Sequence, residues 1–363
     1  MQWGDLITLE YGKPIKDKES VDGPIPVYGT NGQIGTSHLK PLCEHPSFIL
    51  GRKGAYRGVH YSDTPFSVID TAFYAQPISD KVDLKWAYYK FLTYDINRMD
   101  SGSAIPSTDR YEIYSINVDL PDLATQRKVV SVLELLDNKI QDNNKINDNL
   151  EQQAQAIFRQ ELLQNGELPP NWTTGSLLDI ADYLNGLAMQ KFRPVDGERG
   201  LPVLKIKELR QGFCDYSSEL CSPNIKPEFI VHDGDVIFSW SGSLLVDLWC
   251  GGTCGLNQHL FKVTSAKYPK WFYYTWTAHH LARFVAIAAD KATTMGHIKR
   301  EDLAKAEVII PDVASMERIG GVLQPIYDLV INQRIENRKL SMLRDSLLPK
   351  LMSGELDVSA IEL

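Results

Sequence analysis

A glycine-flanked loop at Gly51–Gly58 carries the side chains best suited to chemistry in the first half of the chain. Arg52, Lys53 and Arg57 lie within seven residues of each other, with Tyr56 among them. Arginine and lysine contact phosphates, and arginine pairs with guanine edges. The loop therefore predicts a DNA contact, and the alternative is a solvated turn.

The second half carries a similar loop of small and hydroxyl side chains around Trp240. Ser239, Ser241 and Ser243 could hydrogen-bond to phosphates, whereas a buried Trp240 is the competing interpretation. The pair Gln258-His259 ends a predicted strand, and glutamine can bond to adenine through two hydrogen bonds. A lone histidine is more often structural, so His259 stays open between the two roles.

Further candidates for DNA contact are polar or basic side chains on turns, on small-residue loops and along one strand of the second half. None of these signals is specific alone, but several recur at matching places in both halves. They are Asn31, Ser101, Ser103, Ser107, Thr108, Arg110, Lys205, Lys207, Thr293, Thr294, His297 and Lys299.

The motifs of common enzymes are missing from the sequence. There is no phosphate-binding Gly-x-x-x-x-Gly-Lys-Ser/Thr loop, no His-Glu-x-x-His, no Gly-x-Ser-x-Gly and no Asn-Pro-Pro-aromatic motif. Cys250 and Cys254 lack a second ligand pair nearby, so reduced thiols are favoured over a zinc site. We expect no catalytic residue, metal or cofactor in this chain. The alternative is a nuclease that uses scattered carboxylates such as Asp70, Asp109 and Asp247.

Composition bounds the function further. The 363 residues carry a net charge of −8, which counts against strong autonomous DNA affinity, because phosphate contacts supply most non-specific binding. A partner could contribute the missing positive charge. No apolar run is long enough to cross a membrane, and the N-terminus lacks the features of a signal peptide. These features predict a cytoplasmic protein.

Two long amphipathic segments, Asp122–Gly166 and Asp312–Gly354, must position these loops. Both begin at Pro-Asp, where the aspartate suits a helix N-cap, and both end at Gly-Glu-Leu, where the glycine suits the C′ position. Their apolar residues step 4-3-4-3, and adding 190 to a position in the first segment gives its counterpart in the second. A period of 3.5 predicts a narrow seam against another helix. The predicted seam residues are Val129, Leu133, Leu136, Ile140, Asn143, Asn147, Leu150, Ile157, Val330, Gln333, Asn337, Leu340 and Leu347.

Polar residues interrupt the seam at the same place in both segments. Antiparallel pairing of the two helices would set Asn143 opposite Asn337 and Asn147 opposite Gln333, and such polar pairs fix register. Two independent surface helices are the alternative. Pro325, which follows Gly320-Gly321, is expected to kink or break the second helix.

The segments before the helices also repeat. Trp86-Ala-Tyr-Tyr is similar to Trp271-Phe-Tyr-Tyr, and Ile49-Leu-Gly-Arg-Lys-Gly-Ala55 is similar to Ile237-Phe-Ser-Trp-Ser-Gly-Ser243. Each half therefore reads as a mixed α+β domain followed by a long helix. The expected boundaries are a domain at 1–122, a helix at 123–168, a domain at 169–312 and a helix at 313–363.

The whole chain resembles the specificity subunit of a type I restriction–modification system. The resemblance is carried by Leu120-Pro-Asp-Leu-Ala-Thr-Gln-Arg-Lys-Val-Val130, Leu136-Asp-Asn-Lys-Ile140, Leu347-Leu-Pro-Lys-Leu-Met-Ser-Gly-Glu-Leu356 and Tyr28-Gly-Thr-Asn-Gly-Gln-Ile-Gly35. It implies an α+β fold of two target-recognition domains, joined and spaced by two long helices that form an antiparallel coiled coil, with an internal pseudo-twofold repeat.

The resemblance also implies a function and partners. Each domain would read one half of a bipartite double-stranded DNA site. Two modification subunits would bind S-adenosylmethionine and methylate adenine. Two restriction subunits would use ATP and magnesium and cleave the DNA. Two alternatives are a coiled-coil adaptor that does not read DNA and a specificity subunit of a methylation-only or other multi-subunit restriction system.

Overall fold

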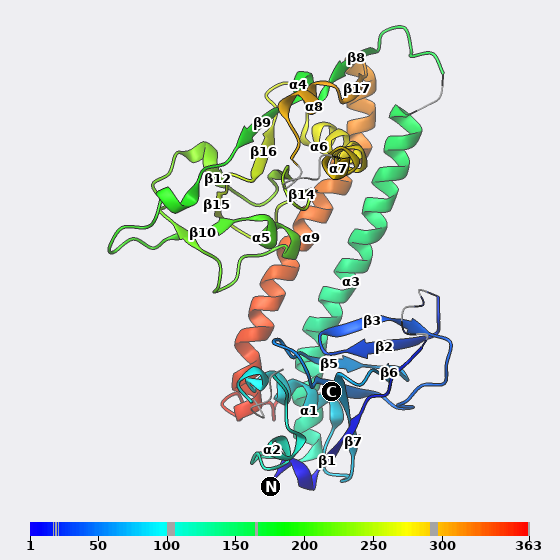
Figure 1. The fold of residues 1–363 in the computed structure, drawn as a ribbon, viewed down its shortest axis with the longest axis vertical. Helices are drawn as coiled ribbons and strands as arrows, with labels where there is room; N and C mark the ends of the chain where they lie inside the picture. The colour runs from blue at the N-terminus through cyan, green and yellow to red at the C-terminus, as the bar shows by residue number, and fades with distance from the viewer. Residues whose placement is uncertain are drawn as a thin grey trace. The chain divides into compact units, whose positions relative to one another are not determined.

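The computed structural model describes residues 1–16, 18, 20, 22–99, 106–163, 166–290 and 297–361. The chain forms two compact units: Met1–Asn138 with Ser341–Leu363 (unit 1), and Lys139–Leu340 (unit 2). Each unit contains one globular domain and part of each long helix, α3 (Leu123–Leu162) and α9 (Val313–Ser353) (Figure 1). None of the helices in the described ranges has the length and apolar character that crossing a membrane requires.

Unit 1 is built on a four-stranded antiparallel sheet in the order β1-β7-β4-β5. A second, three-stranded sheet has the order β3-β2-β6 and contains a parallel β2–β6 pair. The strands are β1 (Ile7–Tyr11), β2 (Ile25–Gly29), β3 (Gly32–Ser37), β4 (Ser47–Gly51), β5 (Val59–Ser62), β6 (Ser67–Val68) and β7 (Ala72–Pro77). The helices before α3 are η1 (Trp3–Asp5), α1 (Leu84–Leu92), η2 (Ile96–Arg98) and α2 (Arg110–Tyr114).

Unit 2 has the same plan. Its main antiparallel sheet has the order β9-β16-β13-β14, and its second sheet contains a parallel β10–β15 pair. The strands are β8 (Thr173–Ser176), β9 (Asp182–Asn185), β10 (Leu201–Leu204), β11 (Leu220–Cys221), β12 (Ile230–Val231), β13 (Val236–Ser239), β14 (Leu245–Leu248), β15 (Cys254–Leu256), β16 (Leu260–Thr264) and β17 (Glu307–Ile310). The helices before α9 are α4 (Leu177–Ile180), η3 (Met189–Lys191), α5 (Ile206–Gln211), η4 (Pro227–Phe229), α6 (Lys270–His279), α7 (Leu281–Asp290) and α8 (Arg300–Ala304).

The predicted internal repeat is confirmed at the level of strand register. Leu50 pairs with Phe73 in unit 1, and Phe238 pairs with Phe261 in unit 2, so β4 corresponds to β13 and β7 to β16. The same alignment makes β1 correspond to β9 and β5 to β14. One local prediction is wrong: the strand expected through Lys207 ends at Leu204, and helix α5 follows.

Both long helices begin as predicted. The Asp122 carboxylate accepts a hydrogen bond from the Thr125 amide, and the Asp312 carboxylate accepts one from the Ser315 amide, each at 2.8 Å. These amide donors lower the pKa of both carboxyl groups below 3.8. Because the folded pKa is the lower one, the stabilisation is complete above about pH 4 and is lost as the pH falls through the folded value.

The helix ends follow the prediction in only one copy. Gly354 has a φ of 76° directly after α9, and the Leu356 amide donates to the Lys350 carbonyl, as in a glycine-terminated helix. α3 instead ends at Leu162, so Gly166 is not its C′ residue. The first helix is therefore six residues shorter than the predicted span to residue 168, and the second, which ends at Ser353, is ten residues shorter than the predicted span to residue 363.

The predicted antiparallel register of the two helices is confirmed within unit 2. The Asn143 amide donates to the Asn337 side-chain oxygen at 2.8 Å and to Glu336 at 2.7 Å. Lys139 adds an ion pair to Glu336 at 3.5 Å. None of the thirteen predicted seam residues is exposed. In unit 1, Arg344, which stands where the first helix has Ala154, pairs with Asp137 across the two helices at 2.9 Å.

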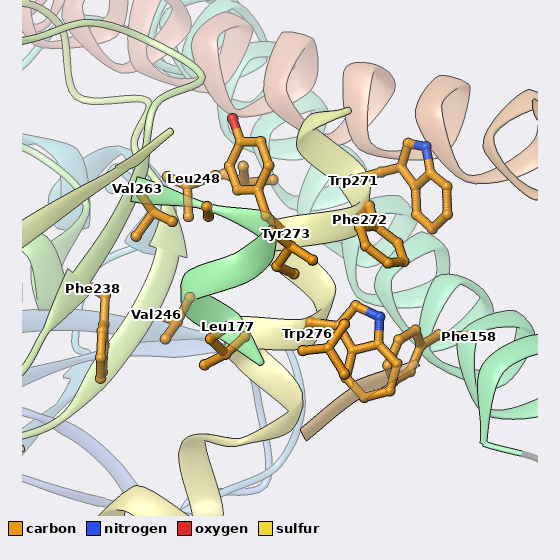
Figure 2. Packing of buried hydrophobic residues seen from close by; sticks show 14 of the residues in the cluster. Phe158, Leu177, Phe238, Val246, Leu248, Val263, Trp271, Phe272, Tyr273 and Trp276 are labelled. Atoms are coloured by element: carbon orange, nitrogen blue, oxygen red, sulfur yellow. The ribbon is translucent and has the colours of Figure 1, made fainter. Parts of the chain in front are cut away.

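The seam is broader than the period predicted, because both helices also pack on the domain cores. In unit 1, Val129 and Leu133 belong to a buried cluster with Trp86. In unit 2, Phe158 of α3 contacts Trp276 of α6, with ring centroids 5.0 Å apart (Figure 2). Burial of these large apolar side chains makes each domain and its helix segments one packed unit.

Pro325 does not break the second helix, contrary to the sequence expectation. α9 continues through it from Val313 to Ser353. Pro325 is exposed, whereas Leu323 and Tyr327 on either side of it are buried in the core of unit 2. This packing holds the helix together across a residue whose own amide cannot donate a hydrogen bond.

Gly320→Ala is expected to destabilise unit 2 by about 1–3 kcal/mol, as overpacking does in other cores. A Cβ at position 320 would lie 2.8 Å from Nε1 of Trp271, which is buried. The neighbouring Gly321→Ala is the matched control: nothing lies within 4 Å of its Cβ, and alanine favours a helix by up to about 1 kcal/mol. Urea denaturation followed by circular dichroism should move the two midpoints in opposite directions, and equal shifts would contradict the packing.

Candidate nucleic-acid interface

Three loops converge in unit 1 at the end of β4. The Thr108 amide donates to the Arg52 carbonyl at 2.9 Å, and Lys53 forms an isolated bridge with Ser107. The Lys53 amide also donates to the Thr71 carbonyl at 3.1 Å. Residues from two separately predicted loops therefore lie side by side.

Unit 2 repeats this junction with different side chains. The Ile298 amide donates to the Trp240 carbonyl at 3.0 Å, and Ser241 forms an isolated bridge with His297. Arg52 thus corresponds to Trp240, Lys53 to Ser241 and Ser107 to His297. The framework is constant, and the side chains that it presents differ.

The junction in unit 1 presents a group of cations. No carboxylate of the described residues lies within ion-pair distance of Arg52, Lys53 or Arg110. The guanidinium of Arg52 lies 4.8 Å from the ring centre of Tyr11, and that of Arg110 lies 4.9 Å from the same ring. A hydrogen bond to the Tyr111 hydroxyl raises the pKa of Arg110, which stays cationic. Such a cluster, in an acidic chain, suits an anionic ligand.

Tyr11 was not predicted from the sequence. It ends β1 and is followed by Gly12, whose Cβ would lie only 2.0 Å from the Ile69 carbonyl oxygen. In unit 2, Asn185 ends β9 and is followed by Gly186, whose Cβ would lie 2.3 Å from the Asn257 carbonyl oxygen. A glycine directly after the first strand of the main sheet in each domain is the sequence signal that could have revealed this position.

Other candidates in unit 1 have mixed outcomes. Tyr56 is 67% exposed, and Asn31 is exposed at the turn between β2 and β3, so both are accessible to a ligand. Arg57 is only 2% exposed, because its guanidinium donates to the carbonyls of Met99 and Asn97. It also donates to Thr108, which is buried as well. We therefore assign Arg57 and Thr108 to the scaffold and leave them out of the proposed DNA-contacting set.

In unit 2, aromatic and imidazole rings gather around Trp240. Its indole Nε1 donates to the Asn185 side-chain oxygen at 2.9 Å, and its ring centre lies 6.3 Å from that of His259 and 5.9 Å from that of His297. Trp240 is half-buried, and both histidines are exposed. Polar and aromatic groups thus occupy the place that cations take in unit 1.

The serines around Trp240 belong mainly to the scaffold. Ser239 is fully buried and donates to the Ser243 carbonyl at 2.9 Å. Ser241 is buried too, and its hydroxyl lies 3.1 Å from Nδ1 of His259. Only Ser243 of this group is exposed, so the other two hydroxyls are not accessible to phosphates.

Lys205 and Lys207 line a cleft of about 430 Å³ that also contains Gln258 and His259. Their ammonium groups are already engaged with carboxylates: Lys205 with Glu219 at 2.5 Å and Lys207 with Asp215 at 3.3 Å. Lys299 is exposed just after the junction. The predictions for Ser101, Ser103, Thr293 and Thr294 lie outside the described residues.

Comparisons with known proteins point to one family. Residues 1–152 match the family model of the type I restriction modification DNA specificity domain. The chain is 25% identical over 309 residues to the type I restriction enzyme MjaIX specificity subunit of Methanocaldococcus jannaschii, covering 78% of this chain and 71% of that protein. It is 20% identical over 320 residues to the HindI specificity subunit of Haemophilus influenzae, covering 67% and 70%.

Residues 1–152 thus carry a type I restriction modification DNA specificity domain, and the chain is similar to type I specificity subunits over most of its length. A crystal structure of such an S subunit from M. genitalium has the same fold: the TM-score is 0.63 at 13% identity, over 97% of this chain and 95% of that one. The predicted α+β architecture with two long paired helices is confirmed by this likeness and by the helix contacts above.

Two of the three carboxylates considered for a nuclease, Asp109 and Asp247, have structural roles. The Asp109 carboxylate caps α2 by accepting from the Tyr111 amide at 2.9 Å. Asp247 pairs with Arg334 at 2.7 Å within unit 2. Within the described ranges, no group of three histidine, cysteine or acidic side chains is arranged to hold a metal ion.

Proposed function

We propose that this chain is the specificity subunit of a type I restriction–modification system and reads a bipartite double-stranded DNA site, with one half-site for each domain. The observation that carries the proposal is the repeated junction of Arg52–Lys53 with Ser107 and of Trp240–Ser241 with His297. One backbone framework that presents two different sets of side chains suits two domains that recognise different DNA sequences. Base edges in the major groove distinguish all four base pairs, so a change of side chain changes the sequence read.

The charge distribution supports a reader that depends on partners. Several basic side chains of unit 1 outside the junction pair with carboxylates, as Lys40 does with Glu44 and Arg98 with Asp95. Arg52, Lys53 and Arg110 have no carboxylate partner in the part of the chain that the structure describes, so the chain with its net charge of −8 keeps a small local cation group. We propose that two modification subunits supply further phosphate contacts, S-adenosylmethionine and adenine methylation. Two restriction subunits would supply ATP- and magnesium-dependent cleavage.

We expect the double variant Arg52→Ala, Lys53→Ala to lose recognition of the first half-site only. Loss of one arginine–guanine pair and one phosphate contact should reduce methylation of cognate sites roughly tenfold to a hundredfold. The measurement is mapping of methylated adenines after co-expression with the modification subunit. The matched control is Lys40→Ala, Arg98→Ala, which removes two exposed cations that already have carboxylate partners. Equal loss at both half-sites would indicate an assembly defect instead.

We also propose that α3 and α9 set the distance between the two half-sites. A four-residue insertion at opposite points of both helices adds about one helical turn, or roughly 6 Å, to each. The mapped motif should keep both half-sites and change the number of base pairs between them. The same insertion in one helix alone is the control, because it should break the Asn143–Asn337 register and abolish activity. An unchanged gap in the double variant would refute the spacer role.

A further inference from the structure

We propose that the last residue of the first main-sheet strand in each domain positions the base-reading side chain of the adjoining loop. These residues are Tyr11 in unit 1 and Asn185 in unit 2. In unit 1, Tyr11 would hold Arg52 and Arg110 for contact with guanine. The inference rests on the proposed function and specifies which chemistry the first domain reads.

The two positions are equivalent by strand register. Tyr11 pairs with Phe73 and Asn185 pairs with Phe261, the same two partners that align β4 with β13. The glycine after each strand end lies against a backbone carbonyl, that of Ile69 in unit 1 and that of Asn257 in unit 2. Two backbone segments therefore approach closely at this point in both units. The strand end is therefore a fixed feature of the framework, while its side chain differs.

Each strand-end residue contacts the equivalent loop residue, but through different chemistry. In unit 1 an aromatic ring on the strand contacts the Arg52 guanidinium at 4.8 Å. In unit 2 an amide on the strand accepts a hydrogen bond from the Trp240 indole at 2.9 Å. Within each domain the strand-end residue and the loop residue thus have side chains that interact with each other, as expected when strand and loop together contact the DNA bases.

The contacts in unit 1 favour guanine edges over phosphates as the ligand of Arg52. Its Nη1 donates to the Asp70 carbonyl at 2.7 Å, and its guanidinium carbon lies 4.8 Å from the ring centre of Tyr11 and 5.8 Å from that of Phe73. A guanidinium held in this way has little rotamer freedom, and bidentate pairing with the O6 and N7 atoms of guanine requires such fixed geometry. Lys53 has no cation–π contact with any ring of the described residues, and its flexible ammonium suits a phosphate.

The test compares Tyr11→Leu with Tyr11→Phe in the full-length chain, co-expressed with the modification subunit. Base preference at each position of the methylated motif is the readout. Tyr11→Phe keeps the ring and should retain the wild-type motif. Tyr11→Leu should relax discrimination at a G·C position of one half-site roughly tenfold. Arg52→Ala should relax the same position, and the double variant should be no worse than Arg52→Ala alone, because the ring acts through the arginine.

Asn185→Ala is the matched control in unit 2 and should alter only the other half-site. Arg52→Lys is the variant for use if Tyr11→Leu does not fold, since it keeps the charge and should still lose guanine discrimination. Uniformly weaker methylation with unchanged base preferences in Tyr11→Leu would show that the ring serves phosphate contacts, and would overturn the inference. Full discrimination in a folded Tyr11→Leu would overturn it as well. If the wild-type chain directs no bipartite methylation, the proposed function fails, and this inference with it.

Discussion

Arg334→Ala should lower the free energy of unfolding of unit 2 by about 3 kcal/mol. The Arg334 guanidinium donates to Asp247 of β14 at 2.7 Å and to Glu151 of α3 at 2.6 Å. Truncation would leave two carboxylates without a cation in a site where the three side chains are 25–32% exposed. Breaking a fully buried pair costs about 3–5 kcal/mol, and partial exposure places this one at the lower end.

The loss in Arg334→Ala should also depend on pH. Burial raises the pKa of Glu151, although Arg334 opposes that shift. Without Arg334 the opposition is gone, so the folded pKa of Glu151 should rise further. A carboxyl whose folded pKa lies above its unfolded value destabilises the fold above that pKa and stops doing so once protonated. The deficit measured by urea denaturation should therefore be larger at pH 8 than at pH 5.

Arg318→Ala is the control for this variant, because it removes the same kind of ion pair from the same helix. Arg318 is 59% exposed and pairs with Glu161 at 2.7 Å. Exposed pairs contribute at most about 1 kcal/mol. If Arg318→Ala lowered the free energy of unfolding as much as Arg334→Ala, the claim that Arg334 stabilises unit 2 by attaching β14 to the helices would be contradicted. Because β14 pairs with β13, which leads into Trp240, that attachment would also orient the second reading loop.

Gly12→Ala should destabilise unit 1 by about 3 kcal/mol and abolish reading of the first half-site. Its Cβ would lie 2.0 Å from the Ile69 carbonyl oxygen and 2.6 Å from that of Val68, and backbone cannot yield as a side chain can. The strand end would have to move, and Tyr11 with it. Gly29→Ala in the same unit is the control, since its nearest neighbours are side-chain carbons of Ile34 and Ile69 at 3.3 and 3.4 Å. Similar urea midpoints for the two variants would contradict the close approach at Gly12.

The sequence predicted those features that depend on period or on repetition. The 3.5-residue spacing placed Asn143 opposite Asn337, and that hydrogen bond is present. The resemblance of Ile49–Ala55 to Ile237–Ser243 predicted matching loops, and strand register aligns them residue by residue. Patterns of this kind are readable because each residue type recurs at a fixed separation.

Features that depend on tertiary contacts could not be read in the same way. Arg57 lies among glycines and looks exposed, yet carbonyl groups of Asn97 and Met99 bind its guanidinium in the interior. A proline inside a helix is expected to break it, but at Pro325 the packing of the neighbouring residues keeps the helix continuous. Tyr11 meets Arg52 only because the end of β1 and the loop after β4 lie at the same end of the sheet, which no local pattern records.

The most direct test of the two-reader proposal is a methylation map of DNA from cells that express this chain with its modification subunit. The account predicts methylated adenines in a motif of two short specific sequences separated by a gap of fixed length. It further predicts that Arg52→Ala, Lys53→Ala alters one of those sequences and Asn185→Ala the other. A continuous motif, or one in which both variants alter the same bases, would contradict two domains that read separate half-sites.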